Sequence, residues 1–493
     1  MLDLSAFGKN DIRGIYGENI TEEVFYYTGK AFVRYLGEQT GKKNSEIWIS
    51  VCRDARLHSP SLSKALVEGI LSTGANVVDM GLAPTPLGYY SEVVGLPPYL
   101  TKYAPVTGAM IITASHNPSQ YNGLKMTYAK QSLDDEQIKA VKELTEREYS
   151  MQLPASPKGI YTEYDLIPDY IEVMTGNFGR IGEGLKIVVD SANATGGVVA
   201  PRLYRALGCE VIELYSMPDG RFPHHHPNPS DEKTLNDIKR AVVENNADLG
   251  IAFDGDADRI GIIDSEGNAL TGDKLLLIYA QDIINQYKLK GIKPFIVSEV
   301  KCSQVLYDTI DALGGISVMC KTGHGYIKSK MKETGAVLAG EMSGHTFFKD
   351  RYYGFDDAIY AGCRIIEILA EKKRRNKEFK ITDMLDPFKK IYSSPEVRLS
   401  CPNSLKKPAL ETFEAIISKN PDFFGDKIKE IITLDGMRIV FENGGFALIR
   451  QSNTEPVFTL RFEAKDETTA RKYEDLMVNK LMDIIKNSAV SAN

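Results

Sequence analysis

The chain has 493 residues, of which 43% are hydrophobic and 25% charged, and its net charge at pH 7 is −7. This length corresponds to about three or four domains, and no apolar run approaches the roughly 18 residues of a membrane span. The acidic balance, without a basic stretch interleaved with aromatic residues, argues against nucleic acid as a partner, and six widely spaced cysteines without a CxxC pair argue against disulfides and zinc.

The chain begins with MLDLSAFGKNDIRG, which contains neither a basic leader nor an apolar run of signal-peptide length. We therefore expect a cytoplasmic protein that is not associated with a membrane. The ordinary composition is typical of a globular protein with several buried cores.

Apolar, β-branched runs alternate with helical periods over most of the chain, a pattern typical of α/β units. The strands expected in the first three units are 47–51, 77–80, 110–113, 185–190, 249–253, 295–300 and 336–338. Helices are expected at 200–207 and 303–313. The last part has expected strands at 437–441, 446–450 and 457–464 followed by a long helix, which indicates an α+β domain.

Chemically suggestive residues follow a predicted strand in each of the first three units: Ser115, Asp254 and Glu341. Open α/β sheets usually bind ligands at the carboxyl ends of their strands. The shared order of elements leads to the hypothesis that the units are structural repeats. The expected domains cover residues 1–155, 156–264, 265–380 and 381–493.

The first candidate motif is Thr113-Ala-Ser-His-Asn-Pro118, which places the Ser115 hydroxyl beside the His116 imidazole in a turn. A serine needs a base or a cation to act as a nucleophile, and His116 and Lys125 are candidates for these roles. By local composition alone, an ordinary serine-containing turn is the stronger interpretation.

The second motif is Asp254-Gly-Asp-Ala-Asp-Arg259, with three carboxylates at alternate positions. Such carboxylates repel one another unless a cation binds them. An EF-hand is excluded because its sixth and twelfth positions require Gly and Glu, whereas this chain has Arg259 and Ser265. The loop therefore predicts a magnesium site, with Arg259 as a fixed positive charge for a transferring phosphoryl group.

Two further polar loops are candidate ligand sites. Gly340-Glu-Met-Ser-Gly-His345 offers a carboxylate, a hydroxyl and an imidazole for sugar hydroxyls. The segment 450–456, RQSNTEP, follows a predicted strand and has an arginine, two hydroxyls and an amide that can bind phosphate. For each loop, a polar surface loop is an equally strong interpretation.

Taken in this order, the motifs TASHNP, DGDADR, GEMSGH and RxSNTxP resemble the α-D-phosphohexomutase superfamily, most closely its bifunctional phosphomannomutase/phosphoglucomutase branch. The resemblance covers nearly the full chain and implies four domains around a central cleft, three similar mixed α/β units and a C-terminal α+β domain. It also implies an intramolecular phosphotransferase that interconverts hexose 1-phosphate and hexose 6-phosphate, with mannose or glucose as the sugar.

The resemblance assigns roles residue by residue. Ser115 would carry the phosphoryl group and, with Asp254, Asp256 and Asp258, hold one Mg²⁺ per subunit. Hexose 1,6-bisphosphate would be the intermediate and activator. The catalytic residues implied are Arg13, Ser115, His116, Lys125, Arg259 and His324. The substrate-binding residues implied are Lys301, Glu341, Ser343, His345, Arg450, Ser452, Asn453 and Thr454.

One departure from the family pattern lies at the opening signature, usually FxxYDIRG, where this chain has Asn10 in place of the common tyrosine. A contact made by that tyrosine is not carried over, and we expect the change to affect substrate orientation more than phosphoryl transfer, because Arg13 is retained. The proton acceptor remains open between Lys125 and His116. The expected partners are small hexose phosphates, and the expected assembly is a monomer or homodimer.

Two alternative functions remain. A phosphoglucosamine or acetylglucosamine-phosphate mutase would share Ser115 and the aspartates, but Met342 favours the mannose/glucose branch, because phosphoglucosamine mutases commonly have glutamine there. An inactive sugar-phosphate-binding scaffold on the same fold is the alternative from another class. The intact serine, aspartates and Arg259 argue against it.

Overall fold

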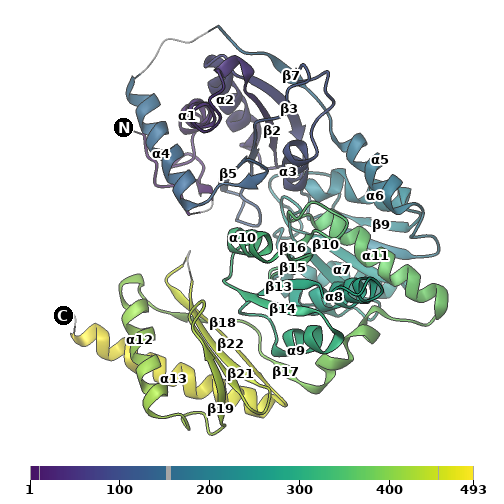
Figure 1. Cartoon of the computed structure of the whole chain (residues 1–493), viewed down its shortest axis with the longest axis vertical. Coiled ribbons are helices and arrows are strands. Elements are labelled where there is room, and N and C mark those ends of the chain that lie inside the picture. Colours follow the sequence, from purple (N-terminus) through teal and green to yellow (C-terminus); the bar gives the residue numbers. More distant parts are fainter. Residues whose placement is uncertain (1, 10, 152–156, 453–454, 492–493) are drawn as a thin grey trace. The chain divides into compact units, whose positions relative to one another are not determined.

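A computed structural model describes residues 2–9, 11–151, 157–452 and 455–491 (Figure 1). The chain forms two compact units. The first unit comprises Met1–Thr271 and Ser343–Lys380, and the second comprises Gly272–Met342 and Ile381–Asn493. None of the helices in the described ranges is long and apolar enough to cross a membrane. All six cysteines are described, buried and free.

The first sheet has the strand order β1-β5-β4-β2-β3-β7, with β6 paired to β5. Its strands are Ile12–Ile15 (β1), Trp48–Arg53 (β2), Asn76–Leu82 (β3), Gly108–Ile112 (β4), Tyr121–Tyr128 (β5), Gln131–Ser132 (β6) and Tyr161–Glu163 (β7). Strands β7, β3, β2 and β4 run parallel, whereas β5 pairs antiparallel with both β4 and β1. The repeated βα pattern predicts parallel pairing, and the hairpin from β4 to β5 makes the sheet mixed.

Helices cover this first sheet. They are Glu22–Thr40 (α1), Ser59–Ser72 (α2), Thr85–Val93 (α3) and Asp135–Met151 (α4). Helices α1, α2 and α4 pack together, and α3 packs on β2 and β4 (Figure 1). Ile49 and Val51 of β2 join the core with α1 and α2, while Ser50 meets Ser91 of α3. Strand β2 is therefore apolar almost throughout, because helices occupy both of its faces.

The second sheet has the order β12-β11-β10-β8-β9. Its strands are Lys186–Asp190 (β8), Glu210–Leu214 (β9), Leu249–Phe253 (β10), Ile260–Asp264 (β11) and Ala269–Leu270 (β12). The helices of this part are Ile167–Phe178 (α5), Ala200–Ala206 (α6) and Asn236–Glu244 (α7). The first unit also contains Thr346–Phe348 (β16) and Ala358–Arg375 (α11).

The second unit begins with a parallel group in which β13 lies between β14 and β15. These elements are Gly272–Lys288 (α8), Phe295–Glu299 (β13), Gln304–Leu313 (α9), Ile316–Cys320 (β14), His324–Thr334 (α10) and Leu338–Gly340 (β15). Short 3₁₀ helices of the chain are Asn44–Glu46 (η1), Thr195–Val198 (η2), Glu232–Leu235 (η3) and Ile381–Lys390 (η4).

The last sheet is antiparallel, with the order β17-β22-β21-β20-β19 and with β18 also paired to β22. Its elements are Tyr392–Ser393 (β17), Val397–Ser400 (β18), Asn403–Lys419 (α12), Ile428–Ile432 (β19), Met437–Phe441 (β20), Phe446–Gln451 (β21), Val457–Ala464 (β22) and Glu467–Ser491 (α13). Helices α12 and α13 pack together against it (Figure 1). The predicted mixed α/β class with a final α+β domain is confirmed.

The first three sheets share one arrangement, which supports the hypothesis of structural repeats. In each sheet the first parallel strand lies in the middle, flanked by the next two: β3-β2-β4, β9-β8-β10 and β14-β13-β15. Ser115, Asp254 and Glu341 all follow the third strand of their group. The shared topology therefore places each candidate loop at the carboxyl end of the equivalent strand. The predicted strands are all present, with ends that differ by no more than two residues.

Candidate active site

The loop after β4 holds Ser115 in an uncommon backbone conformation. Its φ angle is 49°, in the left-handed region that residues other than glycine rarely adopt. The Ser115 amide donates a 2.9 Å hydrogen bond to Thr113 Oγ1, and the residue is 2% exposed. The Ser115 hydroxyl donates a 2.7 Å hydrogen bond to Asp254 Oδ2. The candidate nucleophile thus meets the aspartate loop of the second sheet.

The loop after β10 is shaped to bring its carboxylates close to Ser115. A Cβ on Gly255 would lie 2.3 Å from the Ser115 carbonyl oxygen, so only glycine permits this approach. The amides of Asp258 and Arg259 donate to Asp254 Oδ1, each at 3.2 Å. The loop therefore fixes the Asp254 carboxylate with its own backbone and the serine hydroxyl.

Asp254, Asp256 and Asp258 converge in the folded chain. Each is at most 2% exposed, and one ligand atom from each lies within 4.8 Å of the others. Lys125 Nζ of β5 donates to Asp256 Oδ2 and to Asp258 Oδ2, both at 2.6 Å. The hydroxyl of Thr85 donates to Asp256 Oδ2 at 2.5 Å. One ammonium group thus bridges two of the three carboxylates.

Two carboxylate oxygens in this group accept no hydrogen bond. Among the residues that the structure describes, none donates to the buried Asp256 Oδ1 or Asp258 Oδ1. A buried carboxylate oxygen without a donor is costly unless a cation accompanies it. The three converging carboxylates therefore fit a divalent metal ion with oxygen ligands.

The charges in this loop perturb one another strongly. Burial, Asp258 and Asp256 raise the pKa of the Asp254 carboxyl well above its ordinary value. Burial would also raise the pKa of Asp258, but nearby positive charge, chiefly that of Lys125, outweighs it and lowers that pKa. Burial would lower the pKa of Lys125, but Asp256 and Asp258 outweigh it and raise that pKa well above its ordinary value. Lys125 is therefore a firmly protonated ammonium.

Arg259 links the serine loop to the segment after residue 343. Its Nε donates to His345 Nε2 at 2.9 Å, and its Nη1 lies 3.5 Å from His116 Nε2. His116 Nδ1 in turn lies 3.3 Å from Ser115 Oγ. Arg259 and burial lower the pKa of His116 well below its ordinary value, so His116 is neutral at neutral pH.

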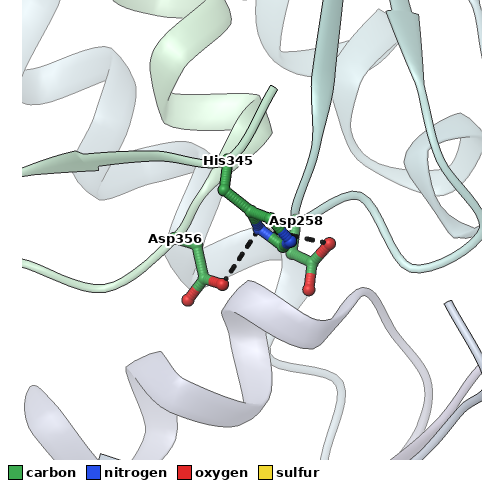
Figure 2. A group of neighbouring side chains, drawn as sticks. All are labelled: Asp258, His345 and Asp356. Atoms are coloured by element: carbon green, nitrogen blue, oxygen red, sulfur yellow. Dashed lines mark ion pairs between the residues drawn. The ribbon is translucent and has the colours of Figure 1, made fainter. Parts of the chain in front are cut away.

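His345 lies between two buried aspartates, as Figure 2 shows. Its Nδ1 is 3.2 Å from Asp356 Oδ2 and 3.8 Å from Asp258 Oδ1. With Nε2 accepting from Arg259, Nδ1 carries the proton and faces the two carboxylates. Arg259 thus fixes which nitrogen is protonated, and the carboxylate of Asp356 beside Nδ1 favours the same tautomer.

Two further predicted residues lie in the first unit. Arg13 of β1 donates to Asn117 Oδ1 at 2.9 Å and to Asp11 Oδ2 at 2.5 Å, so it flanks the serine loop. The Ser343 carbonyl accepts a 2.9 Å hydrogen bond from Ser230 Oγ. The first unit therefore contains Arg13, Ser115, His116, Lys125, the three aspartates, Arg259, Ser343 and His345.

Within the second unit, a buried carboxylate at the end of β13 joins three candidate loops. Glu299 accepts a hydrogen bond from Thr322 Oγ1, and its Oε1 accepts from the Met342 amide at 2.8 Å. Lys301 Nζ lies 3.7 Å from Glu299 Oε1 and 3.2 Å from Glu396 Oε2. Glu341 is 5% exposed and accepts from the Gly323 amide at 2.7 Å. His324, which begins α10, follows that glycine.

The predicted phosphate loop follows β21 in the same unit. Arg450 Nε donates to Asp435 Oδ2 at 3.1 Å, and the same oxygen accepts from the Thr322 amide at 3.0 Å. Lys406 Nζ donates to the Ser452 carbonyl at 2.9 Å. Lys406 of α12 thus contacts this loop directly, and the Thr322 segment is linked to it through Asp435. Asn453 and Thr454, like Asn10, lie outside the described residues.

Comparison with known proteins identifies the family. Sequence models of the phosphoglucomutase/phosphomannomutase family match the chain in four successive parts: α/β/α domain I at residues 4–152, domain II at 168–267, domain III at 271–385 and the C-terminal domain at 396–480. The chain belongs to the phosphoglucomutase/phosphomannomutase family.

Individual relatives agree with this family over the whole chain. The phosphomannomutase/phosphoglucomutase of Pseudomonas aeruginosa is 38% identical over 480 residues, which cover 97% of this chain and 96% of the relative. The phosphoglucomutase of Neisseria gonorrhoeae is 36% identical over 95% of each chain. A crystal structure of a phosphoglucomutase/phosphomannomutase family protein from Burkholderia thailandensis is 35% identical, covers 98% of both chains and has a TM-score of 0.85. The expected family and enzyme class, a phosphohexose mutase, are confirmed.

The family motifs do not include several residues that hold the site in place. Thr85, Glu299 and Asp356 contact candidate site residues and were not expected from the sequence. Thr85 begins α3 and Glu299 ends β13, whereas Asp356 lies in an isolated bridge with Phe347 before α11. Asp356 also directly precedes Asp357, the residue that caps α11 by accepting from the Tyr360 amide. A helix cap alone does not indicate a contact with a distant histidine.

Proposed function

We propose that this mutase transfers a phosphoryl group between O1 and O6 of mannose or glucose phosphates through a phosphoserine at Ser115. The observation that carries this proposal is the position of the Ser115 hydroxyl, 2.7 Å from Asp254 in a group of three converging aspartates. A serine activated for hydrolysis would require a base with an orienting partner and an oxyanion site. Three carboxylates suit a phosphoryl group accompanied by a divalent cation.

Asp254, Asp256 and Asp258 are the residues proposed to hold Mg²⁺, together with the phosphorylated Ser115. Their all-oxygen donor set and the donor-free Asp256 Oδ1 support a hard divalent ion. When bound, Mg²⁺ would neutralise negative charge on the transferring phosphoryl group.

In the proposed reaction, the bond from phosphorus to Ser115 Oγ breaks as a bond forms to a free hydroxyl oxygen of the hexose monophosphate. The proton of that hydroxyl passes to a base, and the hexose 1,6-bisphosphate turns over and returns its other phosphoryl group to Ser115. His116 suits the role of base better than Lys125, because His116 is neutral and lies 3.3 Å from Ser115 Oγ. Lys125, Arg259 and Arg13 would supply positive charge around the phosphoryl oxygens.

The remaining predicted residues are proposed as substrate contacts. Glu341 and Ser343 would bind sugar hydroxyls, and Lys301 and His324 would also contact the substrate. His345, also expected there from the sequence, has its ring nitrogens turned to Arg259 and to two buried aspartates, so it would act by positioning Arg259. Arg450, Ser452, Asn453 and Thr454 would bind the phosphate that is not being transferred. The burial of Glu341 and Arg450, at 5% and 6% exposed, supports contacts with a small ligand rather than with bulk solvent.

We also propose a division into four domains, expected from the sequence at 1–155, 156–264, 265–380 and 381–493. Because the first sheet continues to Glu163 and the second to Leu270, we propose the first two boundaries after those residues. A cytoplasmic location and a monomeric or homodimeric state stay predictions from sequence.

The phosphoserine is tested by intact-mass measurement of untreated protein. We expect a phosphorylated fraction in the wild type that is absent from Ser115→Ala, and a loss of mutase activity of at least about a thousandfold in that variant. Ser119→Ala, at an exposed position of the same loop, is the control and should retain both. Full activity in Ser115→Ala would refute the mechanism.

The sugar is tested on one preparation by comparing kcat/KM for mannose 1-phosphate, glucose 1-phosphate and glucosamine 1-phosphate, with Mg²⁺ and a trace of hexose 1,6-bisphosphate. We expect mannose or glucose phosphate to be preferred. Preference for glucosamine 1-phosphate would move the protein to the alternative branch, and no conversion of any of the three would support the scaffold interpretation.

A further inference from the structure

The left-handed backbone of Ser115 requires a support that the site residues described above do not supply. A residue other than glycine loses about 1–2 kcal/mol in that conformation, so the surrounding structure has to compensate for it. The loop from Ala114 to Tyr121 contains no regular helix or strand until β5 begins. The Asn117 and Tyr121 amides donate to the Ala114 and Pro118 carbonyls within the loop, and the other buried carbonyls need donors from elsewhere.

Arg56 provides these donors from the loop between β2 and α2. It is 1% exposed, and each of its five guanidinium N–H groups has an acceptor. The acceptors, with their distances, are Ser115 O (2.9 Å), Asn117 O (2.7 Å), Pro118 O (2.6 Å), Tyr121 O (3.0 Å) and Asp54 Oδ2 (3.0 Å). One side chain thus gathers four carbonyls of the serine loop around a single planar group.

Asp54 completes this arrangement. Its Oδ2 accepts from Arg56 Nε and, at 3.4 Å, from the amide of Ala114, directly before Ser115. Its Oδ1 accepts from Ser59 Oγ at 2.6 Å and from the Arg56 amide at 3.0 Å. The pair therefore holds both the entry to the serine loop and its carbonyls, and the buried guanidinium has a carboxylate to balance its charge.

The segment after β9 of the second sheet also contacts Arg56. The ring centroid of Phe222 lies 5.4 Å from Arg56 Cζ, a cation–π contact. A Cβ on Gly220 would lie 2.6 Å from Arg56 Cα, so the two loops are in close contact. Arg56 thus packs against the part of the chain that also carries the aspartate loop. This packing limits the movement of the guanidinium relative to Asp254.

We propose that Arg56 is a positioning residue for phosphoryl transfer: it holds the serine loop so that the Ser115 hydroxyl faces Asp254. Its guanidinium donates to carbonyls and to Asp54, whereas the Ser115 hydroxyl donates to Asp254, so Arg56 acts through the loop. A lysine would keep the charge but offers three donors from a single nitrogen, which cannot match five acceptors spread around a plane. This inference rests on the proposed function of Ser115 as the phosphoryl carrier.

The test compares Arg56→Lys with Arg364→Lys. Arg364 is also fully buried in the first unit, where it binds Asp350 and lies 4.7 Å from the ring centroid of Phe348, away from the serine loop. Dephosphorylated enzymes are mixed with glucose 1,6-bisphosphate below the unfolding transition of every variant. The rate of phosphoryl uptake by Ser115 is followed by intact mass, and kcat and KM are measured in parallel.

We expect Arg56→Lys to slow phosphoryl uptake and kcat by about 10- to 100-fold while KM changes less than about threefold, because a misplaced reacting group reduces the rate of the chemical step. Arg364→Lys should lose stability without this loss of rate. Asp54→Asn, which retains the guanidinium of Arg56, should show a smaller reduction in phosphoryl uptake and kcat. It serves as the test if Arg56→Lys does not fold.

A failure of the role proposed for Arg56 differs in its results from a failure of the function proposed for Ser115. Uptake at the wild-type rate in Arg56→Lys and in Asp54→Asn, or an equal loss in Arg364→Lys, would overturn the role of Arg56. If the wild-type enzyme itself takes up no phosphoryl group while Ser115→Ala behaves the same, the proposed function fails instead.

Discussion

The hydroxyl of Thr85, the first residue of α3, donates a 2.5 Å hydrogen bond to Asp256 Oδ2. The Thr85 amide also donates to the Asp256 carbonyl at 2.9 Å. The two residues are 171 positions apart, and Thr85 belongs to the part with the first sheet whereas Asp256 follows β10 of the second sheet. Thr85 thus orients one of the proposed metal ligands. Outer partners of this kind align a carboxylate before the metal binds.

Thr85→Val removes this hydroxyl while nearly preserving the shape of the side chain. We expect the affinity for Mg²⁺ to fall by about tenfold, since the Asp256 carboxylate loses one of its orienting donors. Titration calorimetry measures the affinity, and activity should return at higher Mg²⁺ concentration. Thr145→Val removes an equally buried hydroxyl in α4, bonded to the Val141 carbonyl, and should leave Mg²⁺ binding unchanged. Equal affinities in both variants would contradict the role of Thr85.

Asp256→Asn tests the proposed metal site directly. The Asn side chain removes the negative charge of one proposed ligand and one of the ion pairs of Lys125. We expect the affinity for Mg²⁺ to fall by about 100-fold or more, beyond the effect of an outer partner. Asp264→Asn is a matched control, because that buried carboxylate accepts hydrogen bonds from Glu266 and Asn268 in the turn that follows β11. Wild-type Mg²⁺ affinity in Asp256→Asn would exclude the proposed ligand set.

Asp356→Asn tests whether the aspartate favours this His345 tautomer. The Asn amide can donate to Nδ1 and thereby favour the tautomer in which Nε2 is protonated and faces Arg259. We expect kcat to fall by about tenfold or more with a smaller change in KM, measured by steady-state kinetics. The neighbouring variant Asp357→Asn, whose carboxylate faces Tyr170 and Tyr352 instead, should keep kcat within about twofold. A kcat equal to the wild type in Asp356→Asn would argue against this role.

Asp357 makes the stability of the fold depend on pH. Burial, only partly offset by hydrogen bonds from Tyr352 and others, raises the pKa of its carboxyl from 3.8 to about 6. Between these values the folded state binds a proton that the unfolded state does not, so this group stabilises the fold as pH falls from above 6 toward 4 and the effect is lost as pH rises through about 6. The rise in pKa corresponds to about 3 kcal/mol.

The measurement is urea unfolding of the wild type and of Asp357→Asn at several pH values. We expect the wild type to gain up to about 3 kcal/mol relative to the variant as pH falls from about 7 to about 4, because the amide does not titrate. Other titrating groups cancel in this difference. A difference in free energy of unfolding that is constant with pH would show that Asp357 titrates normally in the folded state.

Much of the fold was predictable because its signals are local. The apolar runs before Ser115, Asp254 and Glu341 predicted strands, and each strand is present with its loop at the carboxyl end. The antiparallel partners β5 and β11 were less evident, because a strand's direction depends on the hairpin before it and not on its own composition.

The sequence by itself determined the family and the identity of the chemical groups: a serine in TASHNP, three alternating carboxylates in DGDADR, and two polar ligand loops. Residue type and short-range spacing are sufficient for these, because each motif is a continuous segment whose chemistry follows from its side chains. Only the tertiary structure decided that Lys125 bridges Asp256 and Asp258, that Asp356 orients His345 and that Arg56 holds the serine loop. These contacts join residues far apart in the chain, and they exist only because packing of the sheets and their loops brings those side chains within hydrogen-bonding distance.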